Sequence, residues 1–154
     1  MTVTRRRETV ASVLWSWTTE TACAPAQARR ALRCALDQLG FPQPVIDDAV
    51  LAAGELVANA VEHGVGPYEL RLHKESGGEL LCEVEDHDPH LPEIPQPRRP
   101  VSSDVSDFQD LDALCAALEE RGRGLQIVDR LSQGRWGFRR APGPAKVAWM
   151  VLPR

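Results

Sequence analysis

The stretch "GELVANAVEHG", residues 54–64, decides the fold and raises the question of function. Glu55, Asn59 and His63 recur every four residues, so they would form one column on successive turns of a helix. Apolar residues fill most of the other positions. The column is either the hydrated side of an amphipathic helix or the polar wall of a binding site.

The surrounding sequence predicts a helix over residues 44–63 with Gly64 as its C-cap. Glu55, Asn59 and Glu62 fall on one side of this helix, and His63 lies at the edge of that side. At about 100° per residue, the apolar positions fall on the opposite side. These positions are Ile46, Ala49, Val50, Ala53, Leu56, Val57, Ala60 and Val61.

Length and composition favour one folded domain spanning residues 1–154. The 43% hydrophobic and 26% charged residues are ordinary for a soluble globular protein. The net charge of −4 argues against direct nucleic-acid binding, and the basic run "TRRRE" at residues 4–8 is too short to change that. No run approaches the roughly 18 apolar residues of a membrane span, and no signal peptide is evident. We therefore expect no membrane association and a cytoplasmic location.

The cysteines show neither a C-x-x-C pair nor zinc-ligand spacing. In a cytosolic chain such residues are most simply small core side chains. This expectation covers Cys23, Cys34, Cys82 and Cys115.

The N-terminal half predicts alternating strands around two helices. "VASVLWSW" indicates a strand around residues 9–17, and "PAQARRALRCALDQL" a helix over residues 25–39. Residues 68–74 and 79–86 alternate as strands joined across "ESGG" in a hairpin. The expected apolar stripe of the first helix consists of Ala28, Leu32, Ala35 and Leu39.

Residues 87–121 form a long excursion that we interpret as a lid or a partner-binding surface. Prolines crowd residues 87–100 and exclude a helix or a central strand there. Residues 107–120 have helical spacing, with Ser106 and Gln109 placed as a capping box. Their apolar stripe covers a ligand, covers another protein or folds back on the sheet. It consists of Phe108, Leu111, Leu114, Cys115 and Leu118.

The C-terminal part, "RGRGLQIVDRLS" at 121–132, predicts a glycine turn that leads into a short helix. "RWGFRR" at 135–140 and "KVAWMVL" at 146–152 predict two strands around the turn "APGPA". The element order β-α-α-β-β-(excursion)-α-β-β predicts an α/β (α+β) two-layer sandwich. Its sheet would be mixed but mainly antiparallel, with the helices on one face.

Three local features could supply chemistry. Glu55 and Asn59 share a helical face, Asp86 ends a strand, and Gly122 and Gly124 precede a helix. Alone, each has an ordinary structural explanation: a solvated face, a turn former and a tight turn.

Together the three features fit a nucleotide site. Glycines before a helix let backbone N–H groups reach a phosphate, and the helix dipole favours its charge. An asparagine oxygen is a hard ligand that suits Mg²⁺. A glutamate can orient or deprotonate a nucleophile, and a buried aspartate can accept a hydrogen bond from an exocyclic amine.

A metal site in "DHDPH" is the competing interpretation of residues 86–90. Asp86, His87, Asp88 and His90 have side chains of zinc-ligand type. If the strand continues, however, His87 and Asp88 would point to opposite sides, and Pro89 restricts the turn.

"ELVANAVEHG", "VEDHDP" and "RGRGLQIVDRLSQGRWG" resemble the N, G1 and G2 boxes of the GHKL ATPase superfamily. In order and spacing they are most similar to its anti-sigma-factor serine/threonine kinase branch. The resemblance covers roughly residues 10–152, and "GPAKVAWMVL" is similar to that branch's closing strands. It implies the Bergerat ATP-binding fold, with residues 87–121 as the ATP lid.

The resemblance also implies a role for each matching residue. Glu55 matches the general base, Asn59 the magnesium ligand, and Asp86 the aspartate that recognises the adenine amino group. The phosphate-binding positions match Gly122 and Gly124, with Arg123 and Leu125 beside them. ATP and Mg²⁺ are thus the implied cofactors.

Two further positions need comment. The G1 box reads D-x-G, but Asp88 stands where the glycine would be, which adds a negative charge close to the nucleotide. His63 ends the N-box helix as it commonly does in this branch, and we interpret it as a capping residue rather than a catalytic one.

The implied activity is transfer of the γ-phosphoryl group of Mg-ATP to a serine or threonine of an antagonist protein, which controls a sigma factor. The implied partners are a sigma factor, that antagonist and a second copy of the chain. An alternative is a catalytically silent module, with or without bound nucleotide, that regulates transcription by occupancy. A detached histidine-kinase catalytic domain fits less well, because no phospho-acceptor helix precedes the boxes.

Overall fold

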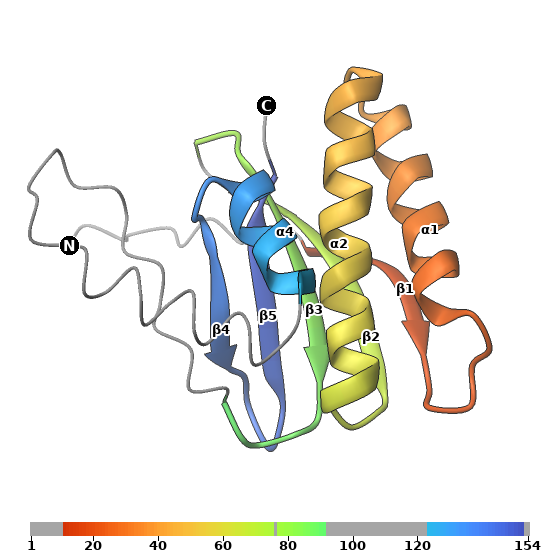
Figure 1. Cartoon of the computed structure of the whole chain (residues 1–154), viewed down its shortest axis with the longest axis vertical. Helices are drawn as coiled ribbons and strands as arrows, with labels where there is room; N and C mark the ends of the chain where they lie inside the picture. Colours follow the sequence, from red (N-terminus) through yellow and green to blue (C-terminus); the bar gives the residue numbers. More distant parts are fainter. Residues whose placement is uncertain (1–10, 76, 92–122, 153–154) are drawn as a thin grey trace, which may run out of the picture.

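A computed structural model of the chain describes residues 11–75, 77–91 and 123–152, and within them five strands and three helices (Figure 1). The strands are β1 (Ala11–Trp17), β2 (Tyr68–Lys74), β3 (Leu80–Asp86), β4 (Trp136–Arg140) and β5 (Lys146–Val151). The helices are α1 (Ala24–Gln38), α2 (Gln43–His63) and α4 (Arg123–Ser132).

The strands form one sheet in the order β1-β2-β3-β5-β4, and each neighbouring pair is antiparallel. The β2–β3 hairpin forms where "ESGG" predicts it, closed by the Glu75 N–H donating to the Glu79 carbonyl at 2.8 Å. The C-terminal strands then add beside β3, which places β3 at the centre of the sheet. The fold class is therefore an α+β two-layer arrangement, as predicted.

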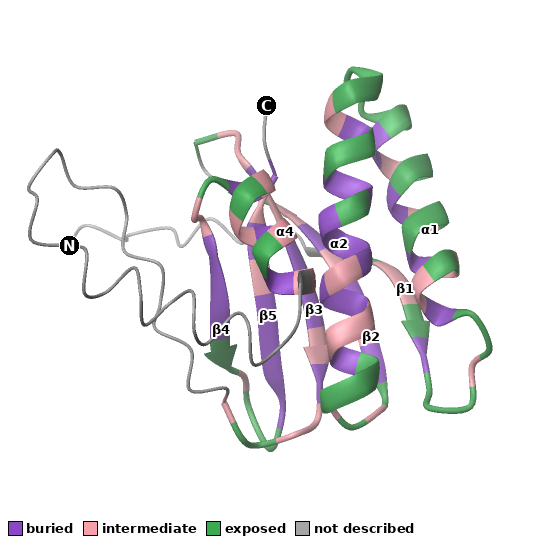
Figure 2. Cartoon of the chain, viewed as in Figure 1, coloured by how far each residue is buried: buried purple, intermediate pink, exposed green. Residues whose placement is uncertain are grey.

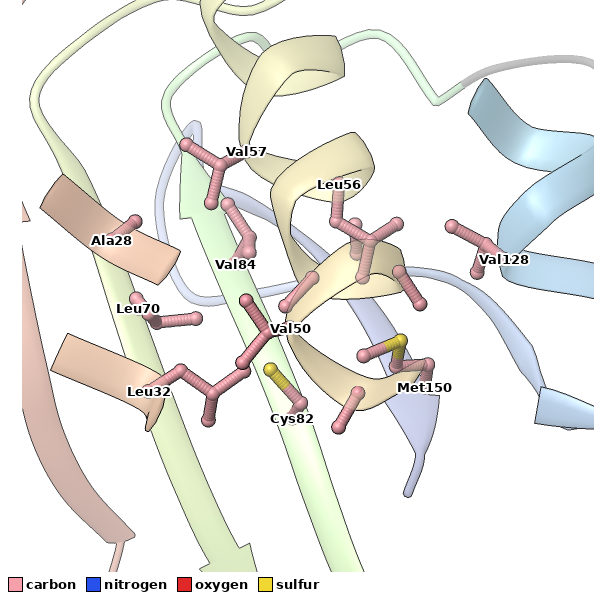
Figure 3. Packing of buried hydrophobic residues seen from close by; sticks show 14 of the residues in the cluster. Ala28, Leu32, Val50, Leu56, Val57, Leu70, Cys82, Val84, Val128 and Met150 are labelled. Carbon is pink, nitrogen blue, oxygen red and sulfur yellow. The ribbon is translucent and has the colours of Figure 1, made fainter. Parts of the chain in front are cut away.

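The three helices cover one face of the sheet (Figure 1). Strand side chains alternate, so Leu70, Cys82 and Val84 reach the core below α1 and α2 (Figure 3). Leu56 of α2, Val128 of α4 and Met150 of β5 belong to the same buried cluster (Figure 3). In Figure 2 buried residues recur along the middle of α2, while both of its ends are exposed. Within the described ranges, no helix is long and apolar enough to cross a membrane.

The opposite face of the sheet carries charge at its centre. Glu83 on β3 is only 2% exposed, and its carboxylate contacts Arg139 at 2.8 Å, Arg71 at 3.4 Å and His73 at 3.4 Å. Arg71 also bonds Glu69 at 3.0 Å. A carboxylate removed from water this far needs such partners.

The predicted apolar stripe of α1 is partly wrong. The buried positions are Ala24, Ala28, Leu32 and Leu36, spaced by four, whereas Leu39 is 59% exposed. Leu39 is the C-cap, beyond the last helical turn, so the helical period no longer places it over the sheet. On α2 the predicted buried side is correct except for Val61, which is 37% exposed near the end of the helix.

The expectation for the cysteines holds for Cys82 alone among the described ones. Cys82 is fully buried on β3, and burial raises the pKa of its thiol to about 12. Cys23 and Cys34 are exposed. Cys34 lies on the outward side of α1, and Cys23 precedes that helix in a left-handed conformation (φ 55°). Cys115 lies outside the described residues.

Candidate functional site

The polar column of α2 stands at the margin of the core. Leu56, Val57 and Ala60 are buried against the sheet, so helical geometry leaves Glu55 and Asn59 half-buried beside them. Neither side chain makes a hydrogen bond or an ion pair with another residue in the described part of the chain. Two polar groups that are partly out of water and have no partner among the described residues are available to a ligand.

The start of α4 lies directly against this column. A Cβ built on Gly124 would come within 2.5 Å of Glu55 Oε2, so the Glu55 carboxylate touches the backbone at the first turn of α4. Leu125, 1% exposed, anchors that turn in the core. Arg123 is the first residue of the helix, and Gly122 lies outside the described residues. A carboxylate and the N-terminal N–H groups of a helix thus lie side by side.

The C-terminal end of α2 meets the end of β3. Gly64 is the predicted C-cap, but its backbone is extended (φ −100°, ψ −175°) rather than left-handed. Its lack of a side chain is needed for space, because a Cβ there would lie 2.6 Å from Asp86 Cγ and 2.8 Å from Asp86 Oδ2. Asp86 is 3% exposed. Gly64 therefore allows a buried carboxylate to pack against the helix end.

His63 makes a different contact from the one expected. Its ring nitrogen Nε2 lies 3.8 Å from the Glu62 carboxylate, and both side chains are exposed. No backbone carbonyl in the described ranges accepts a bond from the His63 ring, so the predicted capping role is not found.

Asp88 is built into the turn that follows β3. Its backbone N–H donates to Asp86 Oδ1 at 2.8 Å, and its own Oδ1 accepts from the His90 N–H at 3.0 Å and contacts His90 Nδ1 at 3.0 Å. Lys146 Nζ on β5 lies 3.6 Å from Asp86 Oδ1 and 3.7 Å from Asp88 Oδ2. A buried ammonium thus offsets the charge that Asp88 adds.

The electrostatics of the two aspartates differ. Burial raises the pKa of the Asp86 carboxyl above its ordinary value, while the Asp88 N–H and the Lys146 ammonium act in the opposite direction. Hydrogen bonds from the backbone and ring of His90 lower the pKa of Asp88. The lowered pKa favours the ionised form of Asp88, whereas the raised pKa favours the protonated form of Asp86.

The residues of "DHDPH" bond to one another and to the loop after α2, and they do not surround a common centre. His87 Nδ1 lies 2.7 Å from the Pro67 carbonyl, and the His87 N–H donates to the Val65 carbonyl at 2.7 Å. These bonds tie the turn after β3 to the loop after α2. Among the residues that the structure describes, no group of three or more metal-ligating side chains could hold an ion.

The predicted site residues form two groups along α2, and these groups are the two ends of the site. Glu55 and Gly124 meet at one end, and Asp86, Asp88 and Gly64 at the other, nine positions along α2. At 1.5 Å per residue these ends are about 14 Å apart along the helix axis, with Asn59 between them. A ligand that touches both ends must be elongated.

Sequence reasoning missed two residues of the site, Lys146 and Tyr68. Lys146 pairs with Asp86 across the β3–β5 ladder, and only the strand order brings them together. The signal was a charged residue opening an otherwise apolar strand. Tyr68 is fully buried, its hydroxyl has no described partner, and burial and then the charge of Asp86 raise its pKa.

Comparison with known proteins identifies the domain. A protein-family model described as the histidine kinase-like ATPase domain matches residues 18–145, which is most of the chain. That range includes α2, the end of β3 and the start of α4, where the two ends of the site lie. A search of curated proteins gave no match. The chain belongs to the histidine kinase-like ATPase domain family, the GHKL type of ATP-binding domain.

Proposed function

We propose that this chain is an ATP-binding regulator of the anti-sigma-factor kinase type. It would transfer the γ-phosphoryl group of Mg-ATP to a serine or threonine of an antagonist protein and so control a sigma factor. The observation that carries the proposal is the contact between the Glu55 carboxylate and Gly124 at the start of α4. It places a candidate base where a helix N-terminus would hold phosphates.

The two ends of the site suit the two ends of ATP. Asp86 would accept a hydrogen bond from the adenine amino group, and the start of α4, with Gly122 just before it, would receive the phosphates. Asn59 lies between them with its side-chain amide free of described protein partners. Its oxygen would be a ligand for the Mg²⁺ that accompanies ATP and neutralises phosphate charge.

The proposed chemistry asks little of the protein beyond position. The attacking hydroxyl oxygen forms a bond to the γ-phosphorus while the bond to the β–γ bridging oxygen breaks, and ADP leaves. Glu55 would take the proton of the hydroxyl. Positioning and charge neutralisation supply most of the acceleration in phosphoryl transfer, so a small set of groups is enough.

The transfer is tested with γ-labelled ATP, the wild-type chain and an extract of the source cells, followed by mass-spectrometric location of the phosphate. The proposal expects label on a serine or threonine of a small protein. Glu55→Gln should reduce the transfer rate by about a hundredfold while ATP binding stays intact. The matched control is Glu62→Gln, because Glu62 is an exposed glutamate on the same helix.

A second candidate is a module that binds ATP and transfers nothing. One observation favours it: Asp88 replaces the expected glycine, so that Lys146 has to offset a second carboxylate at the end of the site formed by Asp86 and Asp88. This candidate replaces the kinase if the wild-type chain binds ATP, no protein is labelled, and Glu55→Gln binds ATP as tightly as the wild type.

A further inference from the structure

Lys146 is a buried cation at the Asp86 end of the site, and the proposed function gives it no contact with the ligand. It is 4% exposed and opens β5, directly opposite Asp86 in the β3–β5 ladder. Directly paired residues of antiparallel strands present their side chains to the same face. Both side chains therefore lie on the face that the helices cover. Any group that bonds the Asp86 carboxylate from that side approaches the Lys146 ammonium as well.

The Lys146 ammonium is held loosely by three oxygens. Nζ lies 3.4 Å from the His90 carbonyl, 3.6 Å from Asp86 Oδ1 and 3.7 Å from Asp88 Oδ2. All three distances exceed the roughly 2.7–2.9 Å of a short charge-assisted hydrogen bond. The ammonium donates a long hydrogen bond to the His90 carbonyl, and the two carboxylates are ion-pair contacts that offset its charge. Because none of the three contacts is short, a ligand that offers a better acceptor could take one of the three N–H donors.

The Asp86 carboxylate is engaged on one side only. Oδ1 accepts the Asp88 N–H at 2.8 Å and faces the Lys146 ammonium at 3.6 Å, so this oxygen is directed towards the protein. The contacts that the structure gives between Asp86 and other described residues do not include a hydrogen bond to Oδ2, the oxygen beside Gly64. Asp86 thus offers one acceptor, next to the donor that Lys146 offers.

We infer that Lys146 is a second base-reading residue, whose ammonium donates to the ring nitrogen N1 of adenine while Asp86 Oδ2 accepts from the 6-amino group. This inference rests on the proposed ATP site. A single acceptor beside a single donor complements the adenine edge, which carries one amino donor next to N1. Guanine presents the acceptor O6 and two adjacent donors, N1–H and the 2-amino group, so pairing its whole edge would need the ammonium and both oxygens of the carboxylate, of which Oδ1 already accepts the Asp88 N–H.

The contact is tested by a cycle between protein and ligand. Calorimetry measures the binding of ATP and of 1-deaza-ATP, in which a C–H replaces N1, to the wild type and to Lys146→Met. The wild type should bind ATP about tenfold more tightly than 1-deaza-ATP, since a hydrogen bond from a charged donor is lost. Lys146→Met should bind the two ligands alike. Lys74→Met, at the opposite end of the sheet, is the control and should keep the wild-type ratio.

A second variant guards against misfolding, because Lys146→Met leaves two carboxylates without their cation. Lys146→Met combined with Asp88→Asn removes one negative charge together with the positive one, and it should also bind ATP and 1-deaza-ATP alike. If either folded variant keeps the wild-type ratio, Lys146 does not touch N1 and the inference fails. Tighter binding of GTP than of ATP by the wild type would overturn it as well.

Failure of this inference is distinguishable from failure of the proposed function. A wild-type chain that binds ATP but does not distinguish it from 1-deaza-ATP overturns the role of Lys146 and leaves the ATP site in place. A folded wild-type chain that binds none of the nucleotides overturns both.

Discussion

Gly64 and Gly124 contribute to the site through the space that they leave. Neither has a left-handed backbone, so conformational freedom is not the reason for glycine here. A Cβ on Gly64 would collide with Asp86, and one on Gly124 would collide with Glu55. The two carboxylates to which we assign recognition and catalysis each lie against one of these glycines.

Alanine at Gly124 should therefore impair transfer while the fold stays intact. The added Cβ would have to displace the Glu55 carboxylate, the flexible partner in that contact, and move the proposed base away from the hydroxyl. We expect phosphoryl transfer to fall at least about tenfold, with an unchanged circular dichroism spectrum. Gly77→Ala is the control, since a Cβ there meets no atom within 4 Å. Equal transfer rates in the two variants would contradict the role of Glu55.

The pH dependence of nucleotide binding should report on Asp86. The carboxylate must be ionised to accept from the base, and burial raises its pKa. Affinity should be constant at high pH and fall by about tenfold per pH unit below the raised pKa. Binding to Asp86→Asn provides the control, because the ATP phosphates titrate equally in both proteins. Parallel pH profiles for the two proteins would exclude Asp86 as the acceptor.

The raised pKa of Asp86 also makes stability depend on pH, but in the direction opposite to nucleotide binding. Because the pKa of Asp86 is higher in the folded chain than the ordinary value of 3.8, folding favours the protonated form. The contribution of Asp86 to the free energy of unfolding is therefore greatest below that ordinary value. It decreases as the pH rises through the raised pKa. Asp86 thus lowers stability at neutral pH, as buried functional carboxylates do.

At the scale of the helix, the packing of α1 gives a test of its burial pattern. Leu36 is fully buried and Leu39 is 59% exposed, although they are three residues apart. Leu36→Ala should lower the free energy of unfolding by about 2–5 kcal/mol, because it leaves a cavity in the core. Leu39→Ala should change it by less than about 0.5 kcal/mol. Urea denaturation of both variants would settle the comparison, and similar losses would contradict the observed packing.

The sequence predicted the bounds of α1 and α2 to within one residue, but periodicity predicted burial less well near the ends of these helices. Over the body of α2 the apolar spacing identified the buried face, because each of those residues has a helical turn before it and another after it. Val61 and Leu39 lie at helix ends, where the chain leaves the sheet and the period no longer fixes burial. The exposed Cys34 shows a related limit, because residue type alone does not say which side of a helix a small side chain occupies.

At the scale of the whole molecule, the sheet face away from the helices depends on one buried carboxylate. Glu83 joins Arg71, His73 and Arg139 from neighbouring strands. Glu83→Ala should lower the free energy of unfolding by about 1–3 kcal/mol, because Arg139 loses its carboxylate partner and Arg71 keeps only Glu69 and Glu85. Thermal unfolding checks this, with the more exposed Glu69→Ala as the comparison. A loss no larger than that of Glu69→Ala would mean that Glu83 is effectively solvated.

The site could be predicted from the sequence only as far as its residues are local. Glu55 and Asn59 share a helix, so helical spacing was enough to associate them. The three boxes supplied Asp86 and Gly124 through their resemblance to a family. Lys146 is absent from that list because its proximity to Asp86 arises from β5 inserting between β3 and β4. Strand order of this kind is set by the packing of the whole chain, and no local pattern encodes it.

The most direct test of the central claim is calorimetric titration of Mg-ATP into the purified wild-type chain and into Asn59→Ala. The account predicts saturable binding by the wild type, weakened by about tenfold or more in Asn59→Ala through loss of the Mg²⁺ ligand. A folded wild-type chain that shows no saturable binding, or one that binds no better than Asn59→Ala, would contradict the assignment of this site to Mg-ATP.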